Sequence, residues 1–195
     1  MIEPMTDALV IVDVQNDFCP GGALAVAGGD EVVAPLNRYA ARFAEAGAPV
    51  FATRDWHPAH TTHFKELGGL WPPHCVGGTA GAEFHRDLCL PPGAIIVSKG
   101  MDPEEDAYSG FQARDASERP FADLLESRGV RRLFIGGLAT DYCVKATALD
   151  AAREGIDVVI LQDAVRAVDL SPGDGARALE EMKAVGARVL TLESL

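Results

Sequence analysis

The chain has 195 residues, of which 48% are hydrophobic and 24% charged, and its formal net charge is −12. This composition is typical of a globular protein, and the length suits one domain with a sizeable apolar core. The strong negative charge argues against nucleic acids and anionic membranes as partners, and no apolar run is long enough to span a bilayer. The first seven residues hold no basic region ahead of an apolar stretch, so they do not resemble a secretion signal, and we expect a cytoplasmic protein.

Six short apolar runs, rich in valine, isoleucine and leucine, recur along the chain. None of them alternates between apolar and polar residues, which is typical of strands that are buried on both faces of a parallel sheet. The runs cover residues 8–12, 49–53, 94–97, 133–135, 158–161 and 189–192.

Four segments with helical spacing of apolar residues lie between these runs. A glycine follows the end of each segment, either directly or after one further residue. A glycine just past a helix tolerates the left-handed conformation that ends it. The segments cover residues 30–45, 117–128, 141–154 and 172–185. This alternation of strand and helix predicts an α/β fold in which helices cover both faces of a parallel sheet. Two long, turn-rich stretches, 57–92 and 100–116, interrupt the alternation, and loops of this length are usually functional.

Polar side chains follow several of the predicted strands. The first three strands end at Asp13, Asp55 and Lys99, the fifth ends at Asp163, and a glycine-rich turn leads from the fourth to Cys143. Ligands of parallel α/β sheets bind outside the carboxyl ends of the strands. We therefore expect a carboxylate, an amine and a thiol to meet at one edge of the sheet.

Cys143 begins a predicted helix, and the amino terminus of a helix carries partial positive charge and unpaired N–H groups. That position lowers the pKa of a thiol, favours the reactive thiolate, and offers donors for an oxyanion. The alternative is that Cys143 is a small buried hydrophobe, the usual role of a free cysteine. Likewise, Asp13 alone could be a cap and Lys99 alone a solvated strand end. The four cysteines form no C-x-x-C pair, which is typical of reduced cytosolic thiols.

A second group of polar residues follows the second strand: Asp55, His57, His63 and His74. Imidazole nitrogens and a carboxylate oxygen suit Zn, Fe or Mn better than Ca or Mg. The spacing matches no compact metal motif, so scattered surface histidines are the alternative. His60 lies between two of the candidates and is an alternative to His63 as a ligand.

Three aromatic residues, Phe18, Trp71 and Tyr108, lie in the loops near these groups. Together they could wall a pocket for a flat ring. Ordinary packing beneath long loops is the alternative for each of them alone.

Five motifs that occur in order resemble those of the isochorismatase-like hydrolases, and the second is similar to the metal segment of the nicotinamidase branch. The likeness runs from residue 8 to about residue 163. The motifs are Asp-Val-Gln-Asn-Asp-Phe at 13–18, Thr-Arg-Asp-Trp-His-Pro at 53–58 with Trp-Pro-Pro-His-Cys at 71–75, Lys-Gly at 99–100, Tyr-Ser-Gly-Phe at 108–111 and Gly-Leu-Ala-Thr-Asp-Tyr-Cys-Val at 137–144.

The resemblance implies a three-layer α/β/α fold with a six-stranded parallel sheet in the order 3-2-1-4-5-6. It implies one domain over residues 1–195, with a metal-binding loop region at about 55–92. It implies a catalytic triad of Asp13, Lys99 and Cys143, and an oxyanion hole formed by the amides of Ala139 and Cys143 after a cis peptide bond that precedes Ala139. In that strand order Lys99 lies two strands from Asp13, roughly 10 Å between backbones.

The resemblance also implies one divalent transition metal, Zn, Fe or Mn, held by Asp55, His57, His63 and His74. Isochorismatases and several carbamoyl amidases lack this ligand set, so its presence favours a nicotinamidase that hydrolyses nicotinamide, and pyrazinamide as well. Phe18, Trp71 and Tyr108 would then contact the substrate, which is the one expected partner.

Three alternatives stay open at this point. The chain could hydrolyse another amide or a carbamoyl compound, it could be a catalytically silent metal-binding or regulatory protein, or it could sense redox state through Cys143. The sequence does not indicate the oligomeric state, and a homo-oligomer is among the alternatives.

Overall fold

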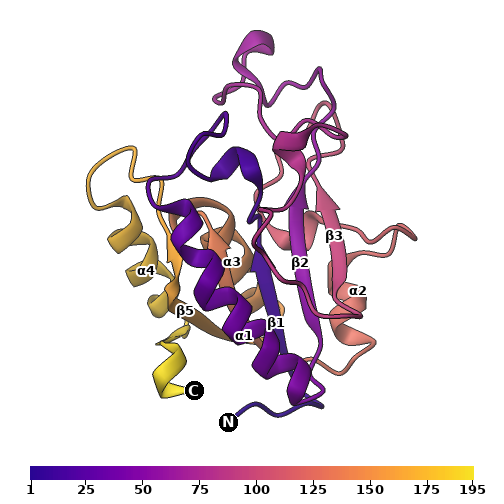
Figure 1. The fold of residues 1–195 in the computed structure, drawn as a ribbon, viewed down its shortest axis with the longest axis vertical. Helices are drawn as coiled ribbons and strands as arrows, with labels where there is room; N and C mark the ends of the chain where they lie inside the picture. The colour runs from indigo at the N-terminus through magenta and orange to yellow at the C-terminus, as the bar shows by residue number, and fades with distance from the viewer.

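The computed structural model describes residues 1–195 and holds a single sheet of six parallel strands in the order β3-β2-β1-β4-β5-β6 (Figure 1). This confirms the predicted fold class and strand order. The strands are β1 (Asp7–Val12), β2 (Val50–Asp55), β3 (Ile95–Lys99), β4 (Arg132–Leu138), β5 (Asp157–Arg166) and β6 (Arg188–Leu190).

Helices cover both faces of this sheet, because side chains of successive strand residues point to opposite faces. Leu9 and Ile11 of β1 pack into the core beneath α1 (Val33–Glu45), whereas Val10 and Val12 pack into the core on the other face. That second face carries the remaining helices, which are α2 (Phe121–Glu126), α3 (Lys145–Arg153) and α4 (Asp174–Ala184). None of the helices has the length and apolar character needed to cross a lipid bilayer.

One predicted helix is shorter than expected. The sequence predicted a helix over 117–128, but α2 begins only after Pro120. The Asp115 carboxylate accepts a hydrogen bond from the amide of Arg119 at 3.0 Å and closes a turn there. A residue that precedes proline is disfavoured in a helix, so this turn takes the place of the first helical turn.

The prediction that every strand is buried on both faces is wrong for the edges. β3 and β6 are the two edge strands, and Ile96 of β3 is 40% exposed. The central strands β1 and β4 are almost fully buried, because each lies between two other strands in the middle of the sheet.

The fifth strand is longer than predicted and does not end at Asp163. It continues to Arg166, and its register against β4 is irregular after Ile135. The carboxylate of Asp163 accepts hydrogen bonds from the Tyr39 hydroxyl of α1 at 2.7 Å and from the Leu192 amide at 3.1 Å. Asp163 therefore fastens α1 and the C-terminal segment to the sheet and takes no part in the site described below.

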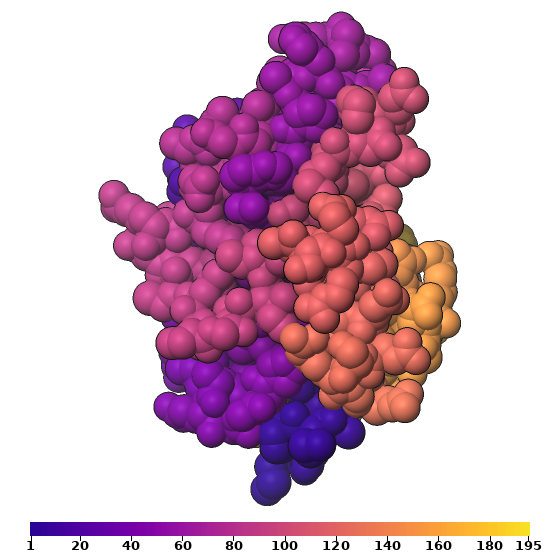
Figure 2. All heavy atoms as spheres, turned by 90° about the vertical axis from the view of Figure 1, so that its right-hand side faces the viewer, coloured from indigo at the N-terminus to yellow at the C-terminus, as the bar shows by residue number.

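The long segment between β2 and β3 rises above the carboxyl ends of the strands (Figure 1). It contains only two short 3-10 turns, Lys65–Leu67 and Ala80–Ala82. In the space-filling view, part of this segment stands out as a lobe at the top of the molecule (Figure 2). Both chain termini lie at the opposite end of the molecule (Figure 1).

Candidate active site

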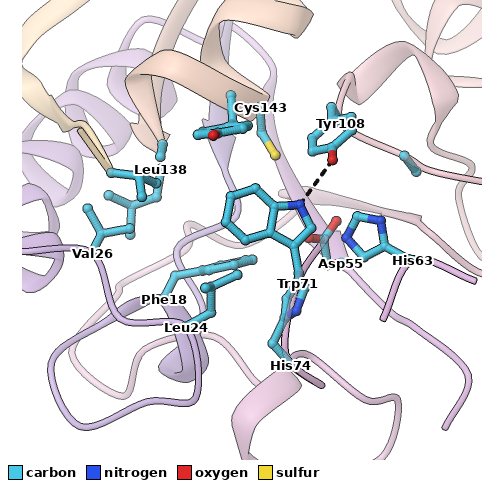
Figure 3. A pocket seen from close by; sticks show the side chains of 14 residues that line it. Phe18, Leu24, Val26, Asp55, His63, Trp71, His74, Tyr108, Leu138 and Cys143 are labelled. Atoms are coloured by element: carbon cyan, nitrogen blue, oxygen red, sulfur yellow. Dashed lines mark hydrogen bonds between the residues drawn. The ribbon is translucent and has the colours of Figure 1, made fainter. Parts of the chain in front are cut away.

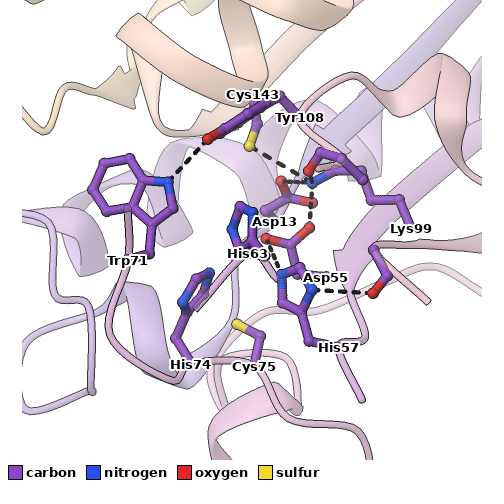
Figure 4. A network of polar contacts seen from close by, with 12 residues as sticks. Asp13, Asp55, His57, His63, Trp71, His74, Cys75, Lys99, Tyr108 and Cys143 are labelled. Carbon is purple, nitrogen blue, oxygen red and sulfur yellow. Dashed lines mark hydrogen bonds and ion pairs between the residues drawn. The ribbon is translucent and has the colours of Figure 1, made fainter. Parts of the chain in front are cut away.

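Three buried side chains meet at the carboxyl edge of the sheet, and we call Asp13, Lys99 and Cys143 the thiol cluster (Figure 4). The Lys99 Nζ lies 2.9 Å from the Asp13 Oδ2 and 3.6 Å from the Cys143 Sγ. The same ammonium contacts the Asp55 carboxylate. The structure thus brings together the carboxylate, the amine and the thiol that the strand ends predicted at one edge.

The end of β1 places Asp13 by a sharp change in backbone direction. Asp13 has a φ of +50°, a left-handed conformation that aspartate tolerates better than most residues. The Thr53 hydroxyl of β2 donates to the Asp13 Oδ1 at 2.6 Å and accepts from the Asp13 amide at 3.2 Å. A single threonine therefore fixes both the backbone and the carboxylate of Asp13.

Lys99 reaches Asp13 across the intervening strand β2. It ends β3 in register with Asp55 of β2, and its side chain extends past Asp55 towards β1. The lysine side chain and the Asp13 carboxylate together cover the two-strand separation, and Lys99 is only 1% exposed. A buried ammonium needs counter-charges, and the carboxylates of Asp13 and Asp55 supply them.

Burial and pairing set the protonation of the thiol cluster. Burial raises the pKa of the Cys143 thiol well above its usual range, although the Lys99 ammonium opposes this rise. Burial also raises the pKa of the Asp13 carboxyl, again against the effect of Lys99. Burial alone would lower the pKa of Lys99, but Asp13 and Asp55 outweigh it and raise the pKa well above its usual range.

The prediction that the position of Cys143 lowers its thiol pKa is therefore wrong. The expected helix at 141–154 begins as a π turn over Thr140–Val144 before α3, and the thiol at its start is only 7% exposed. Loss of hydration outweighs the helix terminus here. Burial thus favours the neutral thiol of Cys143 over its thiolate.

The turn that precedes Cys143 is tightly wound around Ala139. The peptide bond between Leu138 and Ala139 is cis, as the resemblance implied. The amides of Tyr142 and Val144 both donate to the Ala139 carbonyl at 3.1 Å. Ala139 and Cys143 both line the same cavity, so their backbone borders the space next to the sulfur.

The second polar group consists of His57, His63 and His74, which we call the histidine cluster (Figure 4). Their ligand nitrogens lie within 4.8 Å of one another, and all three side chains are buried. The rings of His57 and His63 stack at 4.7 Å. The Asp55 Oδ2 lies 3.7 Å from the His57 Nε2, so Asp55 borders both clusters. His60, in contrast, is exposed and lies outside the cluster.

Each imidazole of the histidine cluster has its Nδ1 occupied by an oxygen that can only accept a hydrogen bond. His57 donates to the Gly100 carbonyl at 3.0 Å, His74 donates to the Pro72 carbonyl at 2.8 Å, and His63 donates to the Asp106 carboxylate. The lone pair of each ring is therefore left on Nε2.

The donor set of the histidine cluster fits a divalent metal ion. The buried Nε2 of His57 has no hydrogen-bond partner in the protein. Burial lowers the pKa of His74 to about 4 and also lowers the pKa of His63, which favours the neutral imidazoles that a metal ion requires. Neutral imidazoles with outer hydrogen bonds on Nδ1 are the usual form of metal-binding histidines.

Two further residues fix this geometry. The Gln15 side chain donates to the Asp55 carbonyl and accepts from the Asp55 amide, both at 2.8 Å, and so holds the end of β2. Gly100 has a φ of +70°, and a Cβ at this position would lie 2.5 Å from the Cε1 of His57. Only glycine lets the backbone approach the imidazole closely enough for the carbonyl to accept its hydrogen bond.

A partly open cavity lies beside the sulfur and the histidine cluster (Figure 3). Eleven of its 14 lining residues are hydrophobic, and they include Phe18, Trp71 and Tyr108, the three aromatics singled out in the sequence. The Trp71 indole N–H donates to the Tyr108 hydroxyl at 3.0 Å and joins two loops over the cavity. A small apolar cavity with a few polar groups at one end is typical of a site for a flat organic molecule.

The sequence did not single out several residues of the site. Thr53 and Gln15 lie inside recognised motifs, and their spacing to Asp13 and Asp55 was the available signal. Asp106 had no such signal, because its contact with His63 joins two loops far apart in sequence. The other apolar lining residues that were not singled out are Leu24, Val26, Ala107, Leu138, Tyr142 and Val168, of which Leu138 and Tyr142 lie inside the motif at 137–144.

The parallel sheet and the buried thiol beside an acid and an amine define a class of α/β hydrolases. A family model for the isochorismatase domain matches residues 7–194, so this chain belongs to the isochorismatase family. Within that family, the chain is 40% identical over 201 residues to the nicotinamidase of Escherichia coli, with 95% of this chain and 94% of that one covered.

Two further comparisons point to the same branch. The chain is 42% identical over 179 residues to the nicotinamidase/pyrazinamidase of Mycobacterium tuberculosis, with 90% of this chain and 94% of that one covered. The crystal structure of the pyrazinamidase of Pyrococcus horikoshii in complex with zinc superposes with a TM-score of 0.88 at 47% identity, covering 95% of this chain and 99% of that chain. These similarities confirm the resemblance predicted from the motifs and show that the chain is an amidohydrolase.

Proposed function

We propose that this chain is a cytoplasmic, metal-dependent cysteine amidase that hydrolyses nicotinamide to nicotinate and ammonia, and that it also accepts pyrazinamide. The observation that carries the proposal is the thiol cluster, in which one ammonium lies 2.9 Å from a carboxylate oxygen and 3.6 Å from a sulfur. The names of the relatives and the mainly apolar cavity lined by aromatic residues support the choice of substrate.

In the proposed mechanism Asp13 acts first as a base. Its carboxylate takes the proton of the Cys143 thiol, and the thiolate attacks the carboxamide carbon. The raised pKa of Asp13 suits this role, because a base accepts a proton more readily as its pKa approaches that of the donor. Lys99 stays positively charged and offsets the negative charge, which moves from the carboxylate to the sulfur within one buried cluster.

The second half of the mechanism returns that proton. The negative oxygen of the tetrahedral intermediate points to the backbone amides of Ala139 and Cys143. Asp13 then donates its proton to the leaving nitrogen, so that ammonia departs and a thioester on Cys143 remains. A water molecule attacks the thioester and Asp13 accepts its proton. The carbon–sulfur bond then breaks, Asp13 returns this proton to the sulfur to restore the thiol, and the acid product leaves and ionises to nicotinate.

The candidate ligands of the metal are Asp55, His57, His63 and His74, and Zn, Fe and Mn are the candidate ions. A bound ion would hold the ring nitrogen of the substrate and so orient the carboxamide towards the sulfur. Asp55 suits a double role, because its Oδ2 faces His57 while its other oxygen contacts Lys99. All these groups belong to one chain, so the proposal needs no second copy.

Ammonia release from a panel of amides tests the proposal. The purified protein is incubated with nicotinamide, pyrazinamide, an aliphatic amide and a carbamoyl compound, and free ammonia is measured. We expect turnover of the two aromatic amides and little of the others. Turnover of the carbamoyl compound alone would instead favour another hydrolase of the family.

A further inference from the structure

The loop that follows β3 touches the histidine cluster at two points. The Gly100 carbonyl accepts a hydrogen bond from His57, and the carboxylate of Asp106, six residues later, accepts one from the Nδ1 of His63. The loop is anchored between these points, since the Pro103 carbonyl accepts from the Thr62 amide at 2.8 Å. The side chain of Gln112 also donates to the Asp106 carbonyl at 3.0 Å and holds Asp106 in place.

His63 differs from the other two histidines in the kind of oxygen that it meets. His57 and His74 donate to backbone carbonyls, whereas His63 donates to a charged side chain. A carboxylate on the outer nitrogen of a ligating imidazole fixes its tautomer and ring plane and raises its basicity more than a carbonyl does. The Asp106 side chain is 61% exposed and that of His63 only 3%, so a surface charge acts directly on a buried ring.

We infer that Asp106 is a positioning residue, which holds the His63 ring with its Nε2 towards the bound metal and so strengthens metal binding. The inference rests on the proposed function, because it requires His63 to be a metal ligand. No neighbouring carboxylate replaces Asp106. The Asp102 carboxylate accepts from the Glu104 amide at 2.9 Å in a local turn, and the carboxylate of Glu105 forms no hydrogen bond or ion pair with a histidine.

The exposure of Asp106 makes the inference testable by substitution. Its side chain belongs to no apolar core, so Asp106→Ala should fold normally. Asp106→Asn keeps an oxygen acceptor but loses the charge, and it separates orientation from charge. Glu105→Ala is the matched control, because it removes the same charge from the same loop without touching a histidine.

Zinc affinity provides the first measurement. Wild type, the three loop variants and His63→Ala are titrated with zinc against a chromophoric chelator. We expect Asp106→Ala to bind zinc about 10–100-fold more weakly, Asp106→Asn to lose less, and Glu105→Ala to stay within about twofold of wild type.

The outcomes separate this inference from the proposed function. If His63→Ala loses zinc but Asp106→Ala binds within about twofold of wild type, Asp106 does not position the ring. Equal losses in Asp106→Ala and Glu105→Ala would show that only the charge of the loop matters, and would overturn the inference as well. If wild type binds no zinc, or His63→Ala binds it unchanged, the ligand assignment in the proposed function fails instead.

Nitrogen-15 spectra of the histidines provide a readout that a merely structural role of Asp106 would not change. In metal-free wild type at neutral pH, we expect the His63 proton on Nδ1. Asp106→Ala should show a mixture of the two tautomers, and Asp106→Asn should keep the wild-type form. An unchanged His63 tautomer in Asp106→Ala would contradict the inference.

Discussion

The thiol cluster and the histidine cluster are neighbours that satisfy their polar atoms in different ways. In the thiol cluster the groups pair with one another, since the Lys99 ammonium lies within reach of Asp13, Asp55 and the sulfur. In the histidine cluster each ring is held from outside by an oxygen on Nδ1, and the Nε2 atoms face one another. Only Asp55 borders both clusters.

This difference indicates which perturbation each cluster should resist. Removal of either charged member of the thiol cluster, Asp13 or Lys99, weakens the pairing of the buried charges, whatever is bound nearby. The histidine cluster, by contrast, should respond to removal of a metal while its hydrogen bonds stay intact. The four experiments below test this contrast, beginning with the largest expected effect.

Replacement of the nucleophile should have the largest effect on activity. We expect Cys143→Ala to lower the rate of nicotinamide hydrolysis by about 10⁴-fold or more, because no other group can form the thioester. Its metal content should equal that of wild type, since the histidine cluster is untouched. Cys89→Ala, at an exposed free cysteine, is the control and should keep full activity. Substantial turnover by Cys143→Ala would remove this residue from the proposed mechanism.

Removal of the metal should have the second-largest effect. Treatment with a strong chelator should lower activity at least about 100-fold, and one of zinc, iron or manganese should restore it. Stability should fall as well, because an ion present at 100 times its dissociation constant stabilises the folded state by about 2.7 kcal/mol. A chelated protein that is free of metal and fully active would contradict the role given to the histidine cluster.

Loss of the buried ammonium should mainly reduce stability. Lys99→Met leaves the carboxylates of Asp13 and Asp55 buried without a counter-charge, which costs about 3–5 kcal/mol of unfolding free energy, measured with urea. Adding Asp13→Asn to this variant should recover part of the loss. Lys183→Met removes an exposed ion pair and should change stability by no more than about 1 kcal/mol. Equal stabilities of the two single variants would show that the thiol cluster is not held by charge.

The smallest of the four effects should come from Thr53. Thr53→Val keeps the shape of the side chain but removes its 2.6 Å hydrogen bond to Asp13. We expect a loss of about 1–3 kcal/mol in stability, because a buried carboxylate oxygen is left with fewer donors. Activity should fall by roughly tenfold, with metal content unchanged. Unaltered kinetics would show that Lys99 alone orients Asp13.

The thiol cluster could be predicted from the sequence because its members follow strands. The carboxyl ends of parallel strands converge at one edge, so Asp13, Lys99 and Cys143 were expected together once their strands were recognised. The order of the strands then followed from the family resemblance. No equivalent rule exists for loops, and the choice between His60 and His63 needed the three-dimensional positions.

Other features depend on depth and on contacts between distant loops. The pKa of Cys143 is raised because the thiol is buried, whereas its position in the sequence indicated only a helix terminus. The hydrogen bond between His63 and Asp106 joins residues 43 positions apart, and no sequence pattern around either residue predicts this contact. Asp163 lies near a strand end in the sequence, yet the irregular register of β5 keeps its carboxylate on the side of α1.

Because residue 100 is a glycine that packs against His57, this position should tolerate few substitutions. Any Cβ there would come within 2.7 Å of the Nδ1 of His57, although residue 100 lies outside the set that lines the substrate cavity. In a library that varies this position, selection for growth on nicotinamide as the sole precursor of pyridine nucleotides should return glycine almost alone. Gly100, which has no side chain, should thus tolerate substitution as poorly as His57, the residue whose imidazole donates a hydrogen bond to the Gly100 carbonyl.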